Sequence, residues 1–242
     1  MIEIKNLTKK TGRAIAIDNL TFSARPQECL GLFGHDGAGK STLLKLLSGA
    51  IPATSGTIKI YDTDISNHPI KAKKIIGYQP ESALGHGNMK VKSFLGYMAE
   101  VRGFHGQEKR KMVDRTITRL ELWRVLDSPI TALPPGHRRK VALAQAILHT
   151  PKLLLLDEPT EGLDPLQKQK IGALIQSLTE DMTVIIASRN PEEFSCICQR
   201  ALVLVEGRLL ADAPVTELQR SSRHYQAITL AADTPLDLLA LA

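Results

Sequence analysis

The sequence is poor in aromatic residues and contains no long apolar run. Phe, Trp and Tyr make up 4% of the 242 residues, so a fold that depends on stacked aromatic rings is not expected. The densest apolar segments, residues 153–156 and 184–187, have only strand length, whereas a membrane-spanning helix needs about 20 apolar residues. Residues 1–5 alternate like a strand and lack the apolar stretch of a signal peptide. We therefore expect a cytosolic protein that reaches a membrane only through a partner.

Cysteine is also scarce, and positive charge is not concentrated. The chain has three cysteines, Cys29, Cys196 and Cys198, and this odd number does not favour disulfides. Cys196 and Cys198 could be two of the ligands of a metal site, but no second ligand pair is visible, so we expect inert thiols. The formal net charge of +6 is compatible with nucleic-acid binding. Lys and Arg are dispersed, however, except at 71–74 and 138–140, where solvated helix faces are the simpler interpretation. No nucleic-acid partner is expected.

The order of apolar patterns predicts an α/β fold with a mainly parallel sheet that is covered on both faces. We assign residues 1–220 to one domain, with a helical subdomain inserted at about 82–150, and residues 221–242 to a short C-terminal tail. Helices are predicted at 41–47, 141–148 and 165–178. Strands are predicted at 2–6, 15–25, 29–33, 57–61, 153–156 and 183–188, with a hairpin at 201–205 and 209–211.

A phosphate-binding loop gives the sharpest signal. Residues 34–41, GHDGAGKS, match the pattern G-x-x-x-x-G-K-[ST] between a predicted strand and a predicted helix. A chance match in a glycine turn would not be expected in this context. Backbone N–H groups and the helix N-terminus can cradle phosphate oxygens, while Lys40 neutralises β- and γ-phosphate charge and Ser41 binds Mg²⁺. The predicted phosphate contacts are Gly34, Asp36, Gly37, Ala38, Gly39, Lys40, Ser41 and Thr42.

Two carboxylates follow the buried strand at 153–156. Asp157 is placed to join the Mg²⁺ shell, and Glu158 to polarise an attacking water as the catalytic base. This pattern is weak alone and strong beside a phosphate loop. The N-K-x-D guanine motif of GTPases and the long heptads of chromosome-maintenance ATPases are both absent.

With these motifs, the chain resembles the ATP-binding subunits of the ABC transporter family over nearly its whole length. The segments GLFGHDGAGKST, IGYQPE and DEPTEGLDP are most similar to subunits paired with ABC-2-type permeases. The resemblance implies a P-loop NTPase core of ABC type with an N-terminal antiparallel β-subdomain and a helical subdomain insert. It implies that Gln79 contacts Mg²⁺ and water and begins the segment that touches the membrane partner, and that Asp164 lies at a dimer seam.

The implied cofactors are ATP and Mg²⁺. The implied partners are an integral membrane permease and a second ATP-binding subunit, either a second copy of this chain or a homologue. The helix at 141–148 resembles the helix that follows the family's L-S-G-G-Q signature, which contacts the nucleotide of the opposite subunit.

Three positions depart from the family pattern, and all three concern ATP. The signature is replaced by residues 133–137, LPPGH, where Pro134 lacks the serine hydroxyl and only the Gly136 amide remains of the expected small donors. Arg189 replaces the histidine after the strand at 183–188. It could stabilise γ-phosphate as an arginine finger does, but guanidinium cannot accept a hydrogen bond from water. Thr11 stands where an adenine-stacking aromatic is expected.

The sequence therefore predicts a transport ATPase that binds Mg-ATP and hydrolyses it slowly. A degenerate ATPase that serves as an assembly or regulatory subunit of a membrane complex is the alternative. A soluble ATPase that acts on DNA or ribosomes is disfavoured, because ribosome-acting relatives usually carry two cassettes in one chain.

Overall fold

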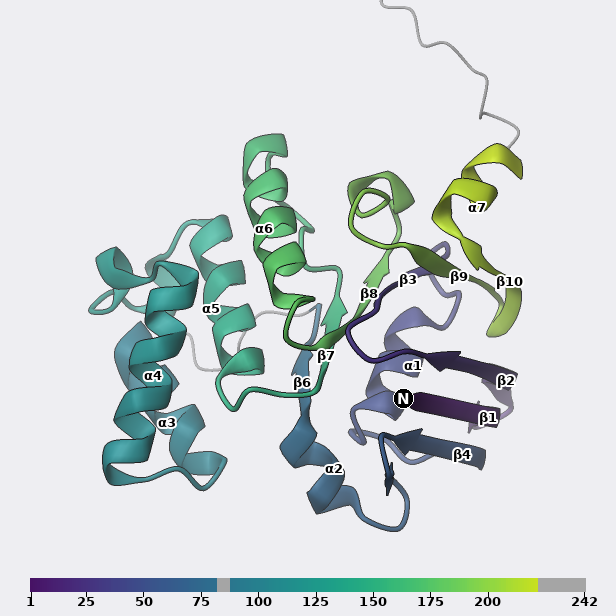
Figure 1. The fold of residues 1–242 in the computed structure, drawn as a ribbon, viewed down its shortest axis with the longest axis horizontal. Coiled ribbons are helices and arrows are strands. Elements are labelled where there is room, and N and C mark those ends of the chain that lie inside the picture. Colours follow the sequence, from purple (N-terminus) through teal and green to yellow (C-terminus); the bar gives the residue numbers. More distant parts are fainter. Residues whose placement is uncertain (82–87, 222–242) are drawn as a thin grey trace, which may run out of the picture.

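Two β-sheets form the frame of the protein (Figure 1). The computed structural model describes residues 1–81 and 88–221. The smaller, antiparallel sheet has the order β2-β1-β4-β5, and the larger sheet has the order β10-β9-β3-β8-β7-β6. The strands of the first sheet are β1 Ile2–Thr11, β2 Ala14–Ala24, β4 Ser55–Ile60 and β5 Thr63–Asp64. Those of the second are β3 Cys29–Phe33, β6 Ile76–Gln79, β7 Leu153–Asp157, β8 Thr183–Ser188, β9 Arg200–Val205 and β10 Arg208–Pro214.

The larger sheet is parallel except for β10, which forms an antiparallel hairpin with β9. Its parallel strands therefore all end at one edge, and the loops that leave β3, β6, β7 and β8 lie next to one another. In open α/β sheets, ligands bind outside such carboxyl ends. The register pairs Asp157 with Ala187 and Gln79 with Leu156, so the last residues of β6, β7 and β8 are nearly level.

Alternation along the central strands builds two hydrophobic cores. Leu154 and Leu156 of β7 belong to a core shared with α3–α6, whereas Leu153 and Leu155 belong to a core shared with α1 and the smaller sheet. Both faces of the larger sheet are thus covered, as predicted, and α3, α4 and α5 lie together at the left of Figure 1. The helices are α1 Lys40–Leu47, α2 Pro69–Ile75, α3 Val91–Val101, α4 Gly106–Leu120, α5 Pro135–Ile147, α6 Pro165–Leu178 and α7 Val215–Ser221. Short 3₁₀ turns cover Trp123–Val125, Ile130–Ala132 and Pro191–Glu193.

The starts of α5 and α6 show how local chemistry sets helix boundaries. Asp164 caps α6 by accepting a hydrogen bond from the Gln167 amide, and Pro165 occupies the first helical position. The predicted helix at 165–178 is therefore confirmed. The predicted start of the preceding helix at 141 is wrong, because α5 begins at Pro135. Its first turns carry basic residues and few apolar ones, so hydrophobic periodicity misses them.

The predicted fold class is confirmed. The strand predicted at 57–61 occupies 55–60, the strand predicted at 2–6 continues to Thr11, and the strand at 183–188 is confirmed. The predicted tail beyond residue 221 and the start of the helical insert at 82–87 lie outside the described residues. In the ranges 1–81 and 88–221, no helix has the length and apolar character required to cross a bilayer.

The three cysteines are free. The buried thiols of Cys29 and Cys198 lie 3.4 Å apart, and their mutual hydrogen bond, together with burial, raises the pKa of Cys198. Cys196 is exposed.

Candidate functional site

A pocket of about 230 Å³ lies where the carboxyl ends of the parallel strands meet. The loop between β3 and α1 forms most of its wall, and Ala16 of β2 adds a further side. Glu81, Glu158 and Arg189 complete it, from the segments after β6, β7 and β8. The predicted phosphate contacts from Asp36 to Thr42 all line this pocket.

The geometry of the phosphate loop requires glycine at its end. Gly39 has φ 101°, and a Cβ there would lie 2.8 Å from the carbonyl oxygen of Ala16. Lys40 starts α1 directly afterwards, and its Nζ donates to the carbonyl oxygens of Gly34 at 2.6 Å and His35 at 3.1 Å. Burial lowers the pKa of Lys40, while Glu158 acts in the opposite direction. The ammonium is thus fixed beside the helix N-terminus, where anions are favoured.

Ser41 and Asp157 come together as predicted for a metal site. Ser41 Oγ donates to Asp157 Oδ1 at 3.1 Å, and the Asp157 side chain is buried. Burial raises the pKa of Asp157, and the Ser41 hydrogen bond opposes that shift. Gln79 is also buried at the end of β6, and within the described residues its Nε2 has no hydrogen-bond partner. This N–H group can therefore donate to a bound water or phosphate, whereas a metal would bind the amide oxygen.

These residues fit Mg²⁺, which prefers hydroxyl, carboxylate and amide oxygens and usually retains water and phosphate ligands. In the part of the chain that the structure describes, no cluster of three or more His, Cys, Asp or Glu side chains could hold a metal unaided. A metal at Ser41 and Asp157 would thus need further oxygens from water or a phosphate.

Glu158 occupies a strained and buried position. Its backbone has φ 45°, in the left-handed region that non-glycine residues rarely adopt. Its Oε1 lies 3.4 Å from Arg189 Nε and 3.9 Å from Lys40 Nζ. Burial raises the pKa of Glu158, whereas Arg189 and Lys40 act to lower it. A carboxylate between two cations, next to a phosphate loop, can hold a water or a proton.

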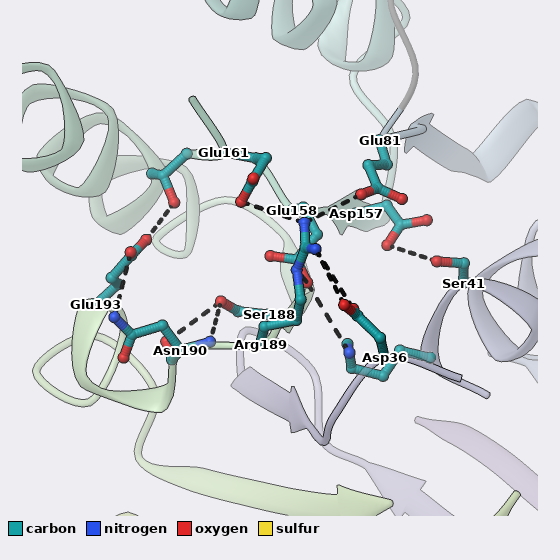
Figure 2. Close-up of polar contacts among 12 residues, drawn as sticks. Asp36, Ser41, Glu81, Asp157, Glu158, Glu161, Ser188, Arg189, Asn190 and Glu193 are labelled. Atoms are coloured by element: carbon teal, nitrogen blue, oxygen red, sulfur yellow. Dashed lines mark hydrogen bonds and ion pairs between the residues drawn. The ribbon is translucent and has the colours of Figure 1, made fainter. Parts of the chain in front are cut away.

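Arg189 is surrounded by four carboxylates, an arrangement we call the Arg189 clamp (Figure 2). Its guanidinium lies 3.2 Å from both Glu81 Oε1 and Glu161 Oε2, and 3.4 Å from both Asp36 Oδ1 and Glu158 Oε1. The sequence suggests that Arg189 could stabilise γ-phosphate, and the structure places Arg189 in the pocket wall. Its charge is matched there by four carboxylates from three loops: Asp36 after β3, Glu81 after β6, and Glu158 and Glu161 after β7.

The clamp contains two residues, Glu81 and Glu161, for which the sequence analysis predicts no role. Glu81 and Glu161 lie inside the motifs at residues 75–81 and 159–165. Their place in these motifs is the sequence feature that could have marked them as functional residues. Arg139 of α5 donates to the carbonyl oxygens of both glutamates at 3.1 Å. The prediction of a solvated helix face at 138–140 is therefore wrong for Arg139, which is half-buried and bound to main chain.

Gly136 is not part of this pocket. It lies at the start of α5 beside the Gln167 side chain of α6, and the residues that line the pocket do not include it. Within one chain, the structure therefore does not bring the altered signature to the phosphate loop. Thr11 is exposed at the end of β1, and no aromatic residue occurs among the described residues that line the pocket.

The sequence comparison agrees with this geometry. The family model described as "ABC transporter" matches residues 17–161, more than half of the chain. The chain belongs to the ABC transporter family.

Similar members of the ABC transporter family are larger proteins. Escherichia coli YbhF, a probable multidrug ABC transporter ATP-binding protein, is 31% identical over 222 residues, which cover 92% of this chain and 38% of that protein. Human ATP-binding cassette sub-family A member 9 is 34% identical over 218 residues, covering 86% of this chain and 13% of that protein. The chain thus spans well under half the length of these relatives.

Solved structures of ABC transporter components share the fold. CbiO1 from Clostridium perfringens, part of the ABC transporter complex cbiONQ, superposes with a TM-score of 0.80 at 25% identity, covering 91% of this chain and 90% of that one. A structure of an ATP-binding subunit of an ABC transporter also gives a TM-score of 0.80, at 24% identity, covering 91% of this chain and 92% of that chain. The chain is therefore an ATP-binding component of this family, whose members generally use ATP with Mg²⁺.

Proposed function

We propose that this chain binds Mg-ATP in the pocket after β3 and drives a separate ABC-2-type permease from the cytoplasmic face of a membrane. A second copy or a homologous ATP-binding subunit completes the site across a dimer interface, where the Gly136 amide meets the partner's nucleotide and Asp164 lies at the seam. The contact between Ser41 and Asp157, beside the fixed Lys40 ammonium, carries this proposal.

In this proposal, several residues that line the pocket and two buried residues outside its lining, Gln79 and Asp157, have defined tasks. Main-chain amides from Gly37 to Thr42 and the Lys40 ammonium hold the phosphates. Ser41, Asp157 and Gln79 hold Mg²⁺, which neutralises phosphate charge when bound. Glu158 orients the attacking water and accepts its proton, and its raised pKa brings its basicity closer to that of a useful general base.

We further propose that hydrolysis is slow, for two structural reasons. The first is the pairing of Glu158 with Arg189, which holds a permanent cation against the proposed base. The Arg189 guanidinium also cannot accept a hydrogen bond from water. The second is the start of α5, where Pro134 and Pro135 have no N–H group to donate to a phosphate. Both changes remove contacts to the transition state and leave the fold intact.

Phosphate release by the purified protein tests the rate. We expect a turnover below about 1 s⁻¹, beneath the enzyme median of about 10 s⁻¹, together with measurable Mg-ATP affinity. Turnover of tens per second from the homodimer would contradict slow hydrolysis and leave the nucleotide site unaffected.

A second cavity, of about 890 Å³, is our proposed contact for the permease. It lies between α2, the strand that ends in Gln79, and the C-terminal end of α3. Ile70 and Val101 on its rim are 77% and 61% exposed, which favours a protein partner at this place. A permease segment bound there would touch the same strand that delivers Gln79 to the pocket.

Substituting Ile70→Glu and Val101→Glu tests this interface. We expect loss of co-purification with the permease and unchanged Mg-ATP affinity, because both residues lie outside the nucleotide pocket. Lys59→Glu, at an exposed position on β4, is the matched control. Retained co-purification would place the permease contact elsewhere.

A degenerate ATPase that acts as an assembly or regulatory subunit is the second candidate. The pairing of Arg189 with four carboxylates favours this candidate, because an arginine held in this way does not stabilise γ-phosphate during hydrolysis. The nucleotide would then act as a structural ligand. Glu158→Gln separates the two: loss of the cellular phenotype supports transport driven by hydrolysis, and a retained phenotype supports the regulatory subunit.

A further inference from the structure

The Arg189 clamp is unevenly buried, and this unevenness suggests which of its ion pairs can open. The Glu158 side chain is 7% exposed, whereas those of Glu81 and Glu161 are 48% and 52% exposed. Arg189 itself is 35% exposed, so its guanidinium can turn without entering the core. Half-exposed ion pairs are individually weak. Asp36, the most exposed partner at 78%, lies on the phosphate loop itself, so Glu81 and Glu161 are the releasable partners outside that loop, and Glu158 is the fixed one.

A second arginine fixes those releasable partners from behind. Arg139 donates one guanidinium N–H to the carbonyl oxygen of Glu81 and another to that of Glu161. Arg189 Nη2 lies 3.2 Å from the side-chain carboxylates of the same two residues. Arg139 thus binds the main chain of Glu81 and Glu161, and Arg189 binds their side chains. Together the two arginines join the segments after β6 and β7 to the loop after β8.

Resting on the proposed function, we propose that Glu81 and Glu161 are positioning residues that keep Arg189 on Glu158 until a triphosphate binds. In this way they set the preference of the pocket for ATP over ADP. Arg139 is the anchor that keeps both carboxylates in place.

The effect on nucleotide choice follows from where the charges lie. Arg189 and Lys40 flank Glu158, and Lys40 is the residue that meets the β- and γ-phosphates in loops of this type. The γ-phosphate adds negative charge on that side, and Arg189 can compensate it only by leaving Glu81 and Glu161. ADP has no γ-phosphate, so Arg189 can keep its ion pairs with Glu81 and Glu161 when ADP binds. Each retained ion pair therefore lowers affinity for ATP and leaves affinity for ADP nearly unchanged.

A thermodynamic cycle tests the proposal. The affinities of the purified chain for Mg-ATP and Mg-ADP are measured by calorimetry for Glu161→Gln, with Arg189 present and in an Arg189→Gln background. With Arg189 present, we expect the ATP-to-ADP affinity ratio to rise about threefold, as suits one half-exposed ion pair, and further when Glu81→Gln is added. In the Arg189→Gln background we expect a change below about 1.5-fold.

The cycle separates the clamp from general electrostatics. Loss of a negative charge alone would strengthen both nucleotides in both backgrounds, and that outcome overturns the proposal. Glu192→Gln is the control, because this exposed carboxylate on the same loop forms no ion pair with any described residue. A wild-type chain that binds neither nucleotide would instead refute the proposed function itself.

Arg139→Gln gives an independent check, because the proposal and simple charge removal predict opposite changes in the ATP-to-ADP affinity ratio. Removing a positive charge near the pocket should disfavour the more negative ATP on charge alone, whereas releasing Glu81 and Glu161 should raise the ATP-to-ADP ratio. A rise supports the anchoring role, and a fall removes Arg139 from the clamp.

Discussion

Lys40 and Arg189 lie on two sides of the same carboxylate, yet the protein holds them by different means. Lys40 is buried and donates to two main-chain carbonyl oxygens, which orient its ammonium without cancelling its charge. Arg189 is a third exposed and is held by four carboxylates, which do cancel its charge. The phosphate-loop side of the pocket is therefore already organised for an anion. On the side after β8, Arg189 must first break ion pairs with its carboxylates before it can bind an anion.

The largest expected effect concerns the carboxylate between the two cations. Glu158→Gln should lower turnover about 100-fold or more, because the proposed general base is lost. Mg-ATP affinity should stay the same or rise, because a negative charge near the phosphates is removed. Phosphate release and calorimetric binding on one preparation check this, with Glu192→Gln as the control. Equal loss of binding and turnover would show that Glu158 supports the fold of the pocket.

The preorganised side is tested through Lys40. Lys40→Ala should lower Mg-ATP affinity about 10- to 100-fold, as expected for the loss of hydrogen bonds to a charged group. Lys59→Ala, at an exposed site on the smaller sheet, should have no effect. Unchanged affinity after Lys40→Ala would contradict the proposed nucleotide pocket.

The other side is tested by restoring residues that resemble the family pattern. Arg189→His combined with Pro134→Ser should raise turnover about tenfold, because a neutral imidazole can accept a hydrogen bond and a serine adds a donor. A steady-state phosphate assay checks the gain, with each single substitution beside the pair. No gain would mean that the predicted slowness has another origin or does not exist.

The pH profile is a smaller but more specific test. Glu158 must be ionised to accept a proton, and Arg189 favours its ionised form. Arg189→Gln removes that influence, so the pKa of Glu158 rises further, and the acidic limb of the turnover profile should move to higher pH. Arg119→Gln, which removes an ion pair with Asp181 on another part of the surface, should leave the limb in place.

The parts of the molecule that the sequence predicted well have local causes. The helix at 165–178 has its own cap and proline, the strand at 153–156 is entirely apolar, and the strand at 183–188 has an apolar centre at 184–187. The phosphate loop was recognisable because its chemistry occupies consecutive residues. The start of α5 was missed because its basic first turns carry no apolar period.

The Arg189 clamp was not predictable for a different reason. Asp36, Glu81 and the pair Glu158 and Glu161 come from three loops, and only the sheet order brings those loops together. An arginine at position 189 is visible in the sequence, but its choice among many carboxylates depends on side-chain geometry. The same holds for Arg139, whose partners are main-chain oxygens that no residue pattern specifies.

The level ends of β7 and β8 have a practical meaning for this site. Asp157 is paired with Ala187 in the ladder, so the residues that follow, Glu158 and Arg189, are spaced by main-chain hydrogen bonds and not by their own side chains. Exchanging the side chain at 189 consequently alters the chemistry next to the base without altering the scaffold. A single substitution at this position would therefore change the polar surroundings of Glu158 while the two strands that space it stay as they are.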